Sequence, residues 1–517
     1  MSILEYGTVP RLDALLARAA ASEPRRPAVI FQGAAQTYAE VCDRARRFAG
    51  VAAAHGLHKG DRVAFWAANR PEFVEVLFGV SMLGGITSPL DHWWKWADAY
   101  VALEQIRPRM LILGGPQALE VSGHHDALQA AGVECVLCLD EDGGGLACEP
   151  YEVQLRSATA LRTLIPVTPI DPAMILFTSG STGRSKGAVH THGSLLSAAG
   201  TMALELALRD GERTLHFLPL FSSCLEHLIP LTLMRATHII MPQFDASAVW
   251  EAIDDFDVTH FDAVPTTLRR ILEVAPPRMP GSLRLVSYAS ERMPERLITA
   301  LMERMPTVEF VEFYGMMEQL CLTVLSHSEQ RRKIGTVGRP MIGAQLYLQS
   351  ADGSPSGPGG AGEIVARSPT LFAGYWQDAA ATGQVMRGEW MRTGDFGRFD
   401  ADGFLMLEGR IKEVIKSGGV TVIPTEIEGV LMQHSSVLDA AVIGVPDERW
   451  GEAVHAFVTL SPGAAASESE LKSFCQERLT GYKRPKAIHI VPELPRTGIG
   501  KIARRVVRAR AAAASLD

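Results

Sequence analysis

The sequence predicts an α/β protein with a large N-terminal domain of helix-covered parallel sheets, which includes a small β unit, and a small α+β C-terminal domain. Apolar runs of strand length alternate with helical segments as far as residue 313, a rhythm typical of parallel strands joined by covering helices. From about residue 335 the strands shorten, and Gly, Pro and Asp turns separate them, as in an antiparallel unit. Mixed strands and helices return past residue 410 for about a hundred residues, the size of a small separate domain. The predicted domains therefore cover residues 1–410 and 411–517.

Hydrophobic periodicity locates the individual elements. Helices are expected at residues 11–21, 71–83 and 194–208, and another is expected to begin near residue 36. Strands are expected at residues 27–31, 61–66, 86–90, 109–113, 134–139, 238–241, 258–264, 283–287 and 308–313. Residues 220–234 form a long apolar stretch that is expected to be buried.

Length and composition restrict the class of protein. A chain of 517 residues, 47% hydrophobic and 21% charged, is typical of a soluble protein with two or more domains. The net charge of −8 argues against nucleic acid or an anionic membrane as the main partner. The N-terminus lacks a signal-peptide pattern, and the most apolar window, residues 76–90, is shorter than the roughly 20 residues of a membrane-spanning helix. We therefore expect a cytoplasmic protein without an integral membrane segment, either a monomer or a homodimer.

The seven cysteines are scattered and odd in number, which suits a reducing compartment rather than a disulfide framework. Cys135 and Cys138 form a CxxC, but a metal site would need a second pair, and Cys148 alone does not supply it. The side chains of Cys135 and Cys138 would also point to opposite faces of an extended strand. No metal or redox site is expected at this CxxC.

A phosphate-binding stretch follows residues 174–177, where an apolar, β-prone run ends in Thr178-Ser-Gly-Ser-Thr-Gly-Arg-Ser-Lys-Gly. Glycines let backbone N–H groups approach a phosphate, hydroxyls donate hydrogen bonds, and Lys186 adds a movable positive charge. A P-loop of the NTPase type needs Gly, four residues and then Gly-Lys-Ser/Thr. Gly180 and Gly183 are too close together for that spacing, and Lys186 does not follow Gly183 directly. The stretch is therefore predicted to hold a phosphate in another way.

The stretch resembles the phosphate loop of the adenylate-forming superfamily, which includes acyl-CoA synthetases, amino-acid adenylation domains and luciferases. Ser185 stands where that loop has proline. The resemblance implies binding of ATP and AMP by Thr178, Ser179, Gly180, Ser181, Thr182, Gly183 and Lys186. It implies in addition that Thr182 is a ligand of a Mg2+ ion.

A second segment, Tyr314-Gly-Met-Met-Glu, is similar to the superfamily's Tyr-Gly-x-Thr-Glu. The similarity implies nucleotide contacts for Tyr314, Gly315 and Met317, and a magnesium ligand in Glu318. A carboxylate that faces a triphosphate makes sense with a divalent cation between them. Met317 replaces the threonine of the pattern, and its thioether cannot donate the hydrogen bond that the threonine gives to the α-phosphate.

Three further segments extend the resemblance toward the C-terminus. Thr-Gly-Asp395 implies a ribose-binding carboxylate, and Gly-Arg410-Ile-Lys412-Glu implies a nucleotide contact for Arg410 and a hinge at Lys412, about which a mobile C-terminal domain rotates. Gly418 and Gly419 match the glycines that line the superfamily's pantetheine tunnel, where a narrow thiol arm must pass close to the backbone.

The last segment, Pro495-Arg-Thr-Gly-Ile-Gly-Lys501, is similar to the superfamily's Pro-x-Thr-x-x-Gly-Lys. The similarity implies that Lys501 is the catalytic lysine and reaches both the reacting carboxylate and the α-phosphate. The implied cofactors are ATP, Mg2+ and coenzyme A.

The acyl-binding region differs most from the superfamily pattern. Ser222 stands where many acyl-CoA synthetases have histidine after an aromatic residue, and Ala289-Ser290-Glu291 stands where many have Gly-Gly-Ala. Ser290 and Glu291 are counted with the nucleotide contacts. The sequence shows no clear acidic partner for an α-amino group, so a hydrophobic organic acid is expected rather than an amino acid. The expected pocket residues are Phe221, Ser222, Cys224, Tyr288 and Met316, with Met317 beside them.

These segments predict an enzyme that activates a hydrophobic carboxylic acid to acyl-AMP with release of pyrophosphate, and then transfers the acyl group to coenzyme A. One alternative is loading of the acid onto the phosphopantetheine of an acyl carrier protein. Another is a nucleotide-binding protein with lost or weak catalysis, because Met317 and Ser185 depart from the pattern.

Overall fold

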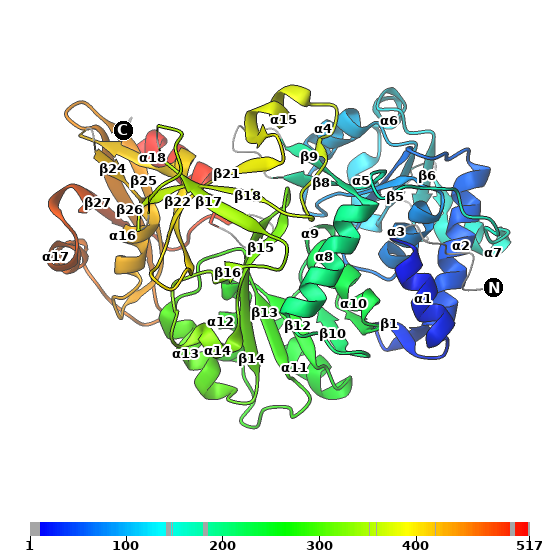
Figure 1. Cartoon of the computed structure of the whole chain (residues 1–517), viewed down its shortest axis with the longest axis horizontal. Coiled ribbons are helices and arrows are strands. Elements are labelled where there is room, and N and C mark those ends of the chain that lie inside the picture. Colours follow the sequence, from blue (N-terminus) through cyan, green and yellow to red (C-terminus); the bar gives the residue numbers. More distant parts are fainter. Residues whose placement is uncertain are drawn as a thin grey trace.

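The computed structural model describes residues 11–140, 146, 148–178, 185–350, 352–357, 359–418, 420–496 and 502–514. These residues form four sheets with helices packed against them, and the C-terminal unit lies at one end of the long axis (Figure 1). The predicted α/β class is confirmed. None of the described helices is long and apolar enough to cross a membrane.

The first sheet has nine strands in the order β16-β15-β14-β13-β12-β10-β11-β1-β2. They are β1 (Pro27–Phe31), β2 (Ala34–Thr37), β10 (Arg213–His216), β11 (Thr237–Ile240), β12 (His260–Ala263), β13 (Leu285–Tyr288), β14 (Glu309–Met316), β15 (Leu320–Leu325) and β16 (Arg339–Pro340). The strands from β1 to β14 in this order pair in parallel, whereas β2, β15 and β16 are antiparallel additions at the two edges. Helices α11 (Ala246–Asp255), α12 (Pro265–Glu273) and α13 (Glu295–Arg304) share one buried core with this sheet.

The second sheet has eight strands in the order β19-β9-β8-β4-β3-β5-β6-β7. They are β3 (Arg62–Trp66), β4 (Ile86–Pro89), β5 (Met110–Leu113), β6 (Cys135–Cys138), β7 (Glu149–Pro150), β8 (Pro172–Thr178), β9 (Lys186–Thr191) and β19 (Gly374–Tyr375). Its helices are α1 (Ala14–Ser22), α2 (Tyr38–Ala54), α3 (Glu72–Met82), α4 (Trp96–Ile106), α5 (Gly115–Val121), α6 (His125–Ala130) and α7 (Tyr151–Ser157). One buried cluster on this sheet includes residues of α1, α2 and α3, and another includes residues of α4, α5 and α6. Both sheets thus follow the alternation of strands and helices that the sequence predicts.

Helix α8 (His192–Glu205) joins the cores of these two sheets. Its Leu195 packs in the cluster of the second sheet, and its Met202 packs in a cluster that contains Phe313 of β14. Thr191 begins this helix with a capping box, because its hydroxyl accepts the Ser194 N–H while the Ser194 hydroxyl accepts the Thr191 N–H. The cap fixes the direction in which the chain leaves β9, and β9 follows the phosphate-binding stretch.

The apolar stretch at residues 220–234 is buried, as predicted. It forms α9 (Leu220–Ser223), a π-helical turn η2 (Cys224–Leu228) and α10 (Ile229–Leu233). Leu228, Ile229 and Leu231 have no exposed surface. A π-helical turn is uncommon and often lies at a functional site.

The third sheet is the small β unit, and all its pairings are antiparallel, as predicted. It consists of β17 (Gln345–Gln349), β18 (Ala361–Arg367), β20 (Met386–Arg387), β21 (Trp390–Phe399) and β22 (Leu405–Arg410), with α15 (Ala379–Val385) beside it. Strand β22 ends at Arg410, so the position of this sheet decides where Arg410 lies.

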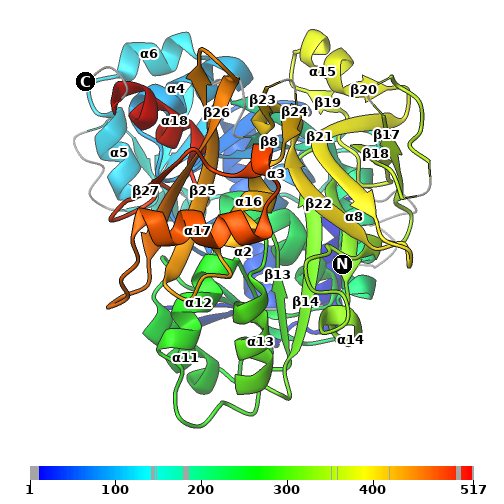
Figure 2. The same cartoon turned by 90° about the vertical axis from the view of Figure 1, so that its left-hand side faces the viewer.

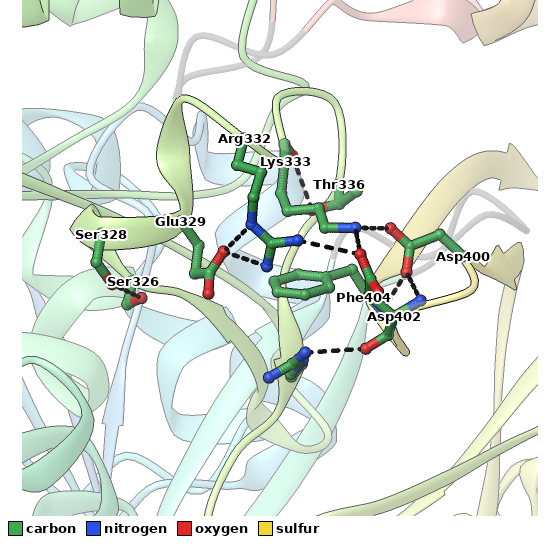
Figure 3. Close-up of polar contacts among 10 residues, drawn as sticks. Ser326, Ser328, Glu329, Arg332, Lys333, Thr336, Asp400, Asp402 and Phe404 are labelled. Atoms are coloured by element: carbon green, nitrogen blue, oxygen red, sulfur yellow. Dashed lines mark hydrogen bonds and ion pairs between the residues drawn. The ribbon is translucent and has the colours of Figure 1, made fainter.

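A polar cluster fixes the turn between β21 and β22 to the chain that follows α14 (His327–Gln330) (Figure 3). Lys333 Nζ lies 2.6 Å from Asp400 Oδ2 and 2.5 Å from Asp402 Oδ2. The amino group of Lys333 also lies 4.7 Å from the centroid of the Phe404 ring, and the guanidinium of Arg339 lies 4.2 Å from it. These contacts hold the third sheet against the edge of the first one.

The fourth sheet forms the C-terminal unit, which Figure 2 shows facing the viewer. Its strands are β23 (Ile415–Ser417), β24 (Val420–Val422), β25 (Val437–Asp447), β26 (Gly451–Leu460) and β27 (Ala487–Ile490), and its helices are α16 (Pro424–Leu431), α17 (Glu468–Arg478) and α18 (Arg504–Ala514). The unit has its own core, with Ile415, Ile427 and Leu471 fully or almost fully buried. Two short 3-10 turns complete the unit, η3 (Ile411–Glu413) and η4 (Gly481–Lys483).

The cysteines differ from the expectation in one respect. Cys138 and Cys148 form a disulfide, because β6 and the chain that enters β7 bring their Cα atoms within 5.9 Å. Cys42, Cys135, Cys321 and Cys475 are free and buried. Cys135 and Cys138 pack in different clusters on opposite faces of the second sheet, as the strand alternation predicts. Within the described residues no group of three His, Cys, Asp or Glu side chains could hold a metal ion.

Candidate active site

The phosphate-binding stretch lies at the turn between the antiparallel strands β8 and β9. Thr178 pairs with Lys186 across this hairpin, and the Thr178 hydroxyl lies 3.5 Å from the Lys186 carbonyl oxygen. The predicted contacts at Ser179, Gly180, Ser181, Thr182 and Gly183 lie outside the described residues. The flanking residues nevertheless place both ends of the stretch side by side.

Tyr375 brings the phosphate-binding stretch and Glu318 together. The amino group of Lys186 lies 5.0 Å from the centroid of the Tyr375 ring, and the Tyr375 hydroxyl donates a hydrogen bond of 2.7 Å to Glu318 Oε1. Burial and the nearby Glu318 carboxylate raise the pKa of Tyr375, so that the phenol stays protonated and donates. Among the residues that the structure describes, Glu318 forms no ion pair. A carboxylate placed in this way fits a magnesium ion that takes most of its other ligands from phosphate and water.

Tyr314, Asp395 and Arg410 form a second polar group, at the junction of the first and third sheets. The Tyr314 hydroxyl donates a hydrogen bond of 2.7 Å to Asp395 Oδ2, and Arg410 Nε lies 3.1 Å from Asp395 Oδ1. Asp395 and Arg410 are direct cross-strand neighbours on β21 and β22. Burial raises the pKa of Tyr314, and the Asp395 carboxylate raises it further. The structure therefore brings together three predicted nucleotide contacts that lie up to 96 positions apart in the chain (410 − 314).

Met317 contributes through its backbone. Its side chain packs against the apolar cluster of the second sheet, and its carbonyl oxygen lies 2.6 Å from His190 Nε2. Burial lowers the pKa of His190 to about 4, so the ring is neutral near pH 7 and Nε2 carries the proton that it donates to this carbonyl. His190 thus positions the turn that carries Met317 and Glu318. Sequence reasoning missed it, because a histidine inside an apolar strand has no motif.

The described side chains among the predicted acyl-pocket residues make contacts of different kinds. The Phe221 ring centroid lies 5.9 Å from that of His92 and 6.3 Å from that of Trp93. Tyr288 is fully buried in the core of the first sheet, where its hydroxyl bonds to Glu312 and Gln330, so it does not line an open surface. The expectation that Tyr288 forms part of the wall is therefore not supported by its position.

Of the other three expected pocket residues, the structure describes the side chains of Met316 and Ser222, and they contact different groups. Met316 packs beside Phe372 and Met391, in the cluster next to β9 and β19. The Ser222 hydroxyl donates to the Pro219 carbonyl oxygen over 3.2 Å. The side chain of Cys224 lies outside what the structure describes.

The aromatic residues after β4 were not predicted, and they connect Phe221 to the phosphate-binding stretch. His92 and Trp93 contact Phe221, and the next residue, Trp94, has its ring centroid 5.8 Å from that of Phe177. Phe177 directly precedes Thr178. The signal in the sequence is the run Asp91-His-Trp-Trp-Lys-Trp, which is dense in aromatic residues and lies just past a predicted strand.

A buried polar group lies beneath the carboxyl ends of β12 and β13. His227, on the π-helical turn, has its Nε2 3.2 Å from Asp262 Oδ1 and 3.3 Å from the Ser287 hydroxyl. Burial by itself would lower the pKa of His227, but the Asp262 carboxylate outweighs burial, and the pKa is raised. This pair lies close to the strand ends at which ligands bind in parallel sheets.

Ser290 and Glu291 follow the end of β13. Ser290 has φ +77°, a left-handed conformation that a residue other than glycine adopts rarely. Glu291 Oε2 accepts a hydrogen bond of 2.9 Å from the Thr266 hydroxyl, at the start of α12.

In the C-terminal unit, Gly418 is the predicted tunnel residue that the structure describes. Its φ is +58°, and a Cβ atom there would lie 2.9 Å from Cε3 of Trp450, so both backbone and space require glycine. Its N–H donates to the Trp450 carbonyl oxygen over 2.8 Å. Lys412 lies in the 3-10 turn between the third and fourth sheets. Gly419 and Lys501 lie outside the described residues.

Two sheets of mainly parallel strands and a small antiparallel sheet, followed by a small C-terminal unit, give this chain the fold of an adenylate-forming enzyme. The family model of AMP-binding enzymes matches residues 16–376, and that of the AMP-binding enzyme C-terminal domain matches residues 426–501. The chain belongs to the AMP-binding enzyme family, and the predicted membership of the adenylate-forming superfamily is confirmed.

Similar proteins over the full length are CoA ligases. The chain is 33% identical over 500 residues to a feruloyl-CoA synthase of Amycolatopsis sp, which covers 95% of this chain and 97% of that protein. It is 34% identical over 499 residues to a 2-succinylbenzoate–CoA ligase of Geobacillus kaustophilus, covering 94% and 95%. The crystal structure of an anthranilate CoA ligase in complex with anthranoyl-AMP superposes with a TM-score of 0.90 at 27% identity, covering 99% of this chain and 100% of that one. These findings confirm the prediction of an acid–thiol ligase that uses ATP to activate a carboxylic acid and coenzyme A to accept it.

Proposed function

We propose that the protein activates an aromatic carboxylic acid of small size and transfers it to coenzyme A. The observation that carries this proposal is the group of rings formed by His92, Trp93 and Phe221. The next residue in the chain, Trp94, contacts Phe177, which directly precedes Thr178. A flat aromatic acid gains edge-to-face contacts from such rings, worth about 0.5–1.5 kcal/mol for each pair beyond apolar burial. The aromatic acids in the names of the similar ligases support the same class.

In the first half-reaction the substrate carboxylate attacks the α-phosphorus of ATP, giving acyl-AMP and pyrophosphate. Asp395 accepts hydrogen bonds from the ribose, and Arg410 holds the Asp395 carboxylate in place from β22. Lys186 places positive charge at the β- and γ-phosphates. Lys501 places it at the α-phosphate and the carboxylate, where negative charge builds up in the transition state. One such contact at 4 Å is worth about 4 kcal/mol at an effective dielectric constant near 20.

Glu318, with Thr182, would hold a magnesium ion against the triphosphate. Such an ion neutralises phosphate charge and makes pyrophosphate a better leaving group. Tyr375 orients the Glu318 carboxylate through its hydroxyl, and His190 orients the backbone of the same turn.

In the second half-reaction the thiolate of coenzyme A attacks the acyl carbonyl carbon, and AMP leaves with the electron pair of the broken C–O bond. Gly418 and Gly419 would line the path of the pantetheine arm, after residues 411–517 have turned about Lys412. The proposed domain boundary is therefore between residues 410 and 411. The proposed compartment is the cytoplasm, where ATP and coenzyme A are both available.

A panel of carboxylic acids scored for pyrophosphate release, with and without coenzyme A, tests this function. We expect release with benzoate, cinnamate and indoleacetate types and formation of the thioester when coenzyme A is added. Activity restricted to long straight-chain acids or to amino acids would contradict the aromatic class. Transfer to a phosphopantetheinylated carrier protein and not to coenzyme A would show that the acceptor is a carrier protein. No acid-dependent pyrophosphate release at all would favour a nucleotide-binding protein without catalysis.

A further inference from the structure

The C-terminal unit lies beside α12 and α13 (Figures 1 and 2). Arginine side chains make contacts between this unit and the large part of the chain. Arg292 Nη1 donates to the Thr425 carbonyl oxygen over 3.2 Å and lies against Gly429 of α16. Arg296 donates to the Gln433 carbonyl oxygen. These two contacts end on backbone atoms of the C-terminal unit, so they hold one surface against the other without involving a predicted site residue of that unit.

Arg496 makes a contact of a different kind, because it reaches Glu291, a predicted residue of the nucleotide site. Its Nη1 lies 3.3 Å from the Thr266 hydroxyl oxygen and 3.9 Å from Glu291 Oε1. Thr266 donates in turn to Glu291 Oε2, so the hydroxyl accepts from Arg496 and donates to Glu291 at once. Thr266 lies in the first turn of α12, three residues after the end of β12, and Glu291 lies three residues after the end of β13. The Arg496 side chain therefore ends at the carboxyl edge of the first sheet.

Arg496 is also fixed within its own unit. Its Nη2 pairs with Asp439 of β25, and the side chains of Arg496, Glu291 and Asp439 are 29%, 20% and 17% exposed. An ion pair that is this far withdrawn from solvent is screened less than the usual surface pair. The guanidinium therefore bridges the two parts of the molecule through groups on both sides.

Arg496 lies five residues before Lys501 in the chain, so its contact with Thr266 and Glu291 bears on the position of that lysine. Arg496 and Ile502 form an antiparallel bridge, and the Ala503 N–H donates to the Pro495 carbonyl oxygen over 2.7 Å. The described residues on either side of positions 497–501 therefore lie next to each other. Arg504, two residues after Ile502, pairs with Glu428 at 2.6 Å and with Glu413 at 3.4 Å, and both partners lie within residues 411–517.

We propose that Arg496 is a positioning residue for adenylation. Its contact with Thr266 and Glu291 fixes the base of the segment that carries Lys501 at the edge of the first sheet and so favours the arrangement in which that lysine serves the first half-reaction. This inference rests on the proposed role of Lys501. Residues 411–517 cannot turn about Lys412 for the thioester step while this bridge is intact. The bridge must form and break once in each catalytic cycle, and the cost of breaking it sets the balance between the two half-reactions.

The test compares the two half-reactions separately. In the variant Arg496→Ala we expect a loss of about tenfold or more in the rate of acid-dependent pyrophosphate release, measured in a single turnover without coenzyme A. Formation of thioester from chemically supplied acyl-AMP and coenzyme A should be unchanged or faster. Thr266→Val, which removes the hydroxyl at nearly constant volume, should act in the same direction with a smaller loss. The matched control is Arg478→Ala, because the contacts that the structure gives Arg478 are with Glu477 and with the Phe474 backbone and ring, all in its own helix.

A second readout does not depend on activity. Hydrogen exchange at the first turn of α12 and at residues 437–447 should be faster in Arg496→Ala than in the parent protein, because the bridge no longer restrains the two surfaces. An equal loss of both half-reactions, or unchanged pyrophosphate release, would overturn the proposal. If the parent protein releases no pyrophosphate, or if Lys501→Ala releases it normally, the proposed function fails. Faster exchange in Arg496→Ala would then show that the Arg496 contact restrains the two surfaces, but not that it serves adenylation.

Discussion

The Tyr314 hydroxyl donates a hydrogen bond of 2.7 Å to the Asp395 carboxylate, across the junction between the first and the third sheet. Tyr314 lies near the end of β14 in the large parallel sheet, and Asp395 lies on β21 of the small antiparallel one. The bond holds the carboxylate against the strand that leads to Glu318. The predicted nucleotide contacts Tyr314 and Asp395 therefore come from two sheets of different kinds.

Asp395→Asn should weaken ATP binding by about 10- to 100-fold, because a hydrogen bond to a charged acceptor is worth about 1.5–3 kcal/mol. Isothermal titration calorimetry with ATP measures the change. Asp352→Asn, in the exposed hairpin between β17 and β18, is a control of the same chemistry that should bind ATP like the parent protein. An unchanged ATP affinity in Asp395→Asn would exclude Asp395 from the ribose site.

Glu318→Gln should raise the magnesium concentration needed for half-maximal pyrophosphate release by about tenfold or more, because the amide is a weaker ligand for a hard cation. Chelation of magnesium should abolish release in the parent protein. Glu389→Gln removes a carboxylate whose side chain is 83% exposed, and it should leave the magnesium titration unchanged. A parallel shift in both variants would show that Glu318 acts only through general charge.

Trp93→Ala should raise the KM for an aromatic acid about three- to tenfold and leave the KM for ATP unchanged, since the ring contacts that the structure gives Trp93 are with His92 and Phe221. Steady-state pyrophosphate release gives both constants. Tyr482→Ala is the comparison variant, because Tyr482 is an aromatic residue of similar exposure in the C-terminal unit. Equal effects on the acid and on ATP would argue for a general change of structure.

The buried histidines should make the fold sensitive to acid. Burial lowers the pKa of His190 to about 4 and that of His238 to about 3, whereas an unfolded histidine titrates near 6.5. The unfolded state therefore binds more protons below pH 6.5. The stabilisation is complete above that pH and is lost as the pH falls toward the folded pKa values. At pH 5 each histidine should lower the free energy of unfolding by about 2 kcal/mol, from 1.36 kcal/mol for each pKa unit.

Urea unfolding between pH 7.5 and pH 5 measures this slope. In His238→Gln the protein should be less stable at pH 7.5, because His238 bonds to His216 and Thr232, but the slope with pH should be smaller. His58→Gln removes an exposed histidine, and its slope should match that of the parent protein. Equal slopes in all three proteins would assign the acid sensitivity to other groups.

The local sequence determined the elements and the chemistry of the segments. Strands such as Pro27–Phe31 and helices such as Glu72–Met82 lie within about a residue of their predicted bounds, because hydrophobic periodicity reports which face of an element is buried. The resemblance to the adenylate-forming superfamily implied nucleotide contacts for Asp395 and Arg410 and a magnesium ligand in Glu318, because the short motifs that carry the resemblance are local in the sequence.

Only the tertiary structure decided which side chains meet. Tyr288 and Met316 carry the right chemistry for an acyl pocket, but strand direction and register place Tyr288 in the core and Met316 beside Phe372. His190 and Trp93 lie outside every motif, and Arg496 stands at the variable second position of the Pro-x-Thr segment. Their contacts are with residues 127, 128 and 230 positions away (Met317, Phe221 and Thr266). The Cys138–Cys148 disulfide likewise depends on how β6 and β7 lie beside each other. Periodicity fixes which residues are buried, whereas the pairing of distant elements fixes what they are buried against.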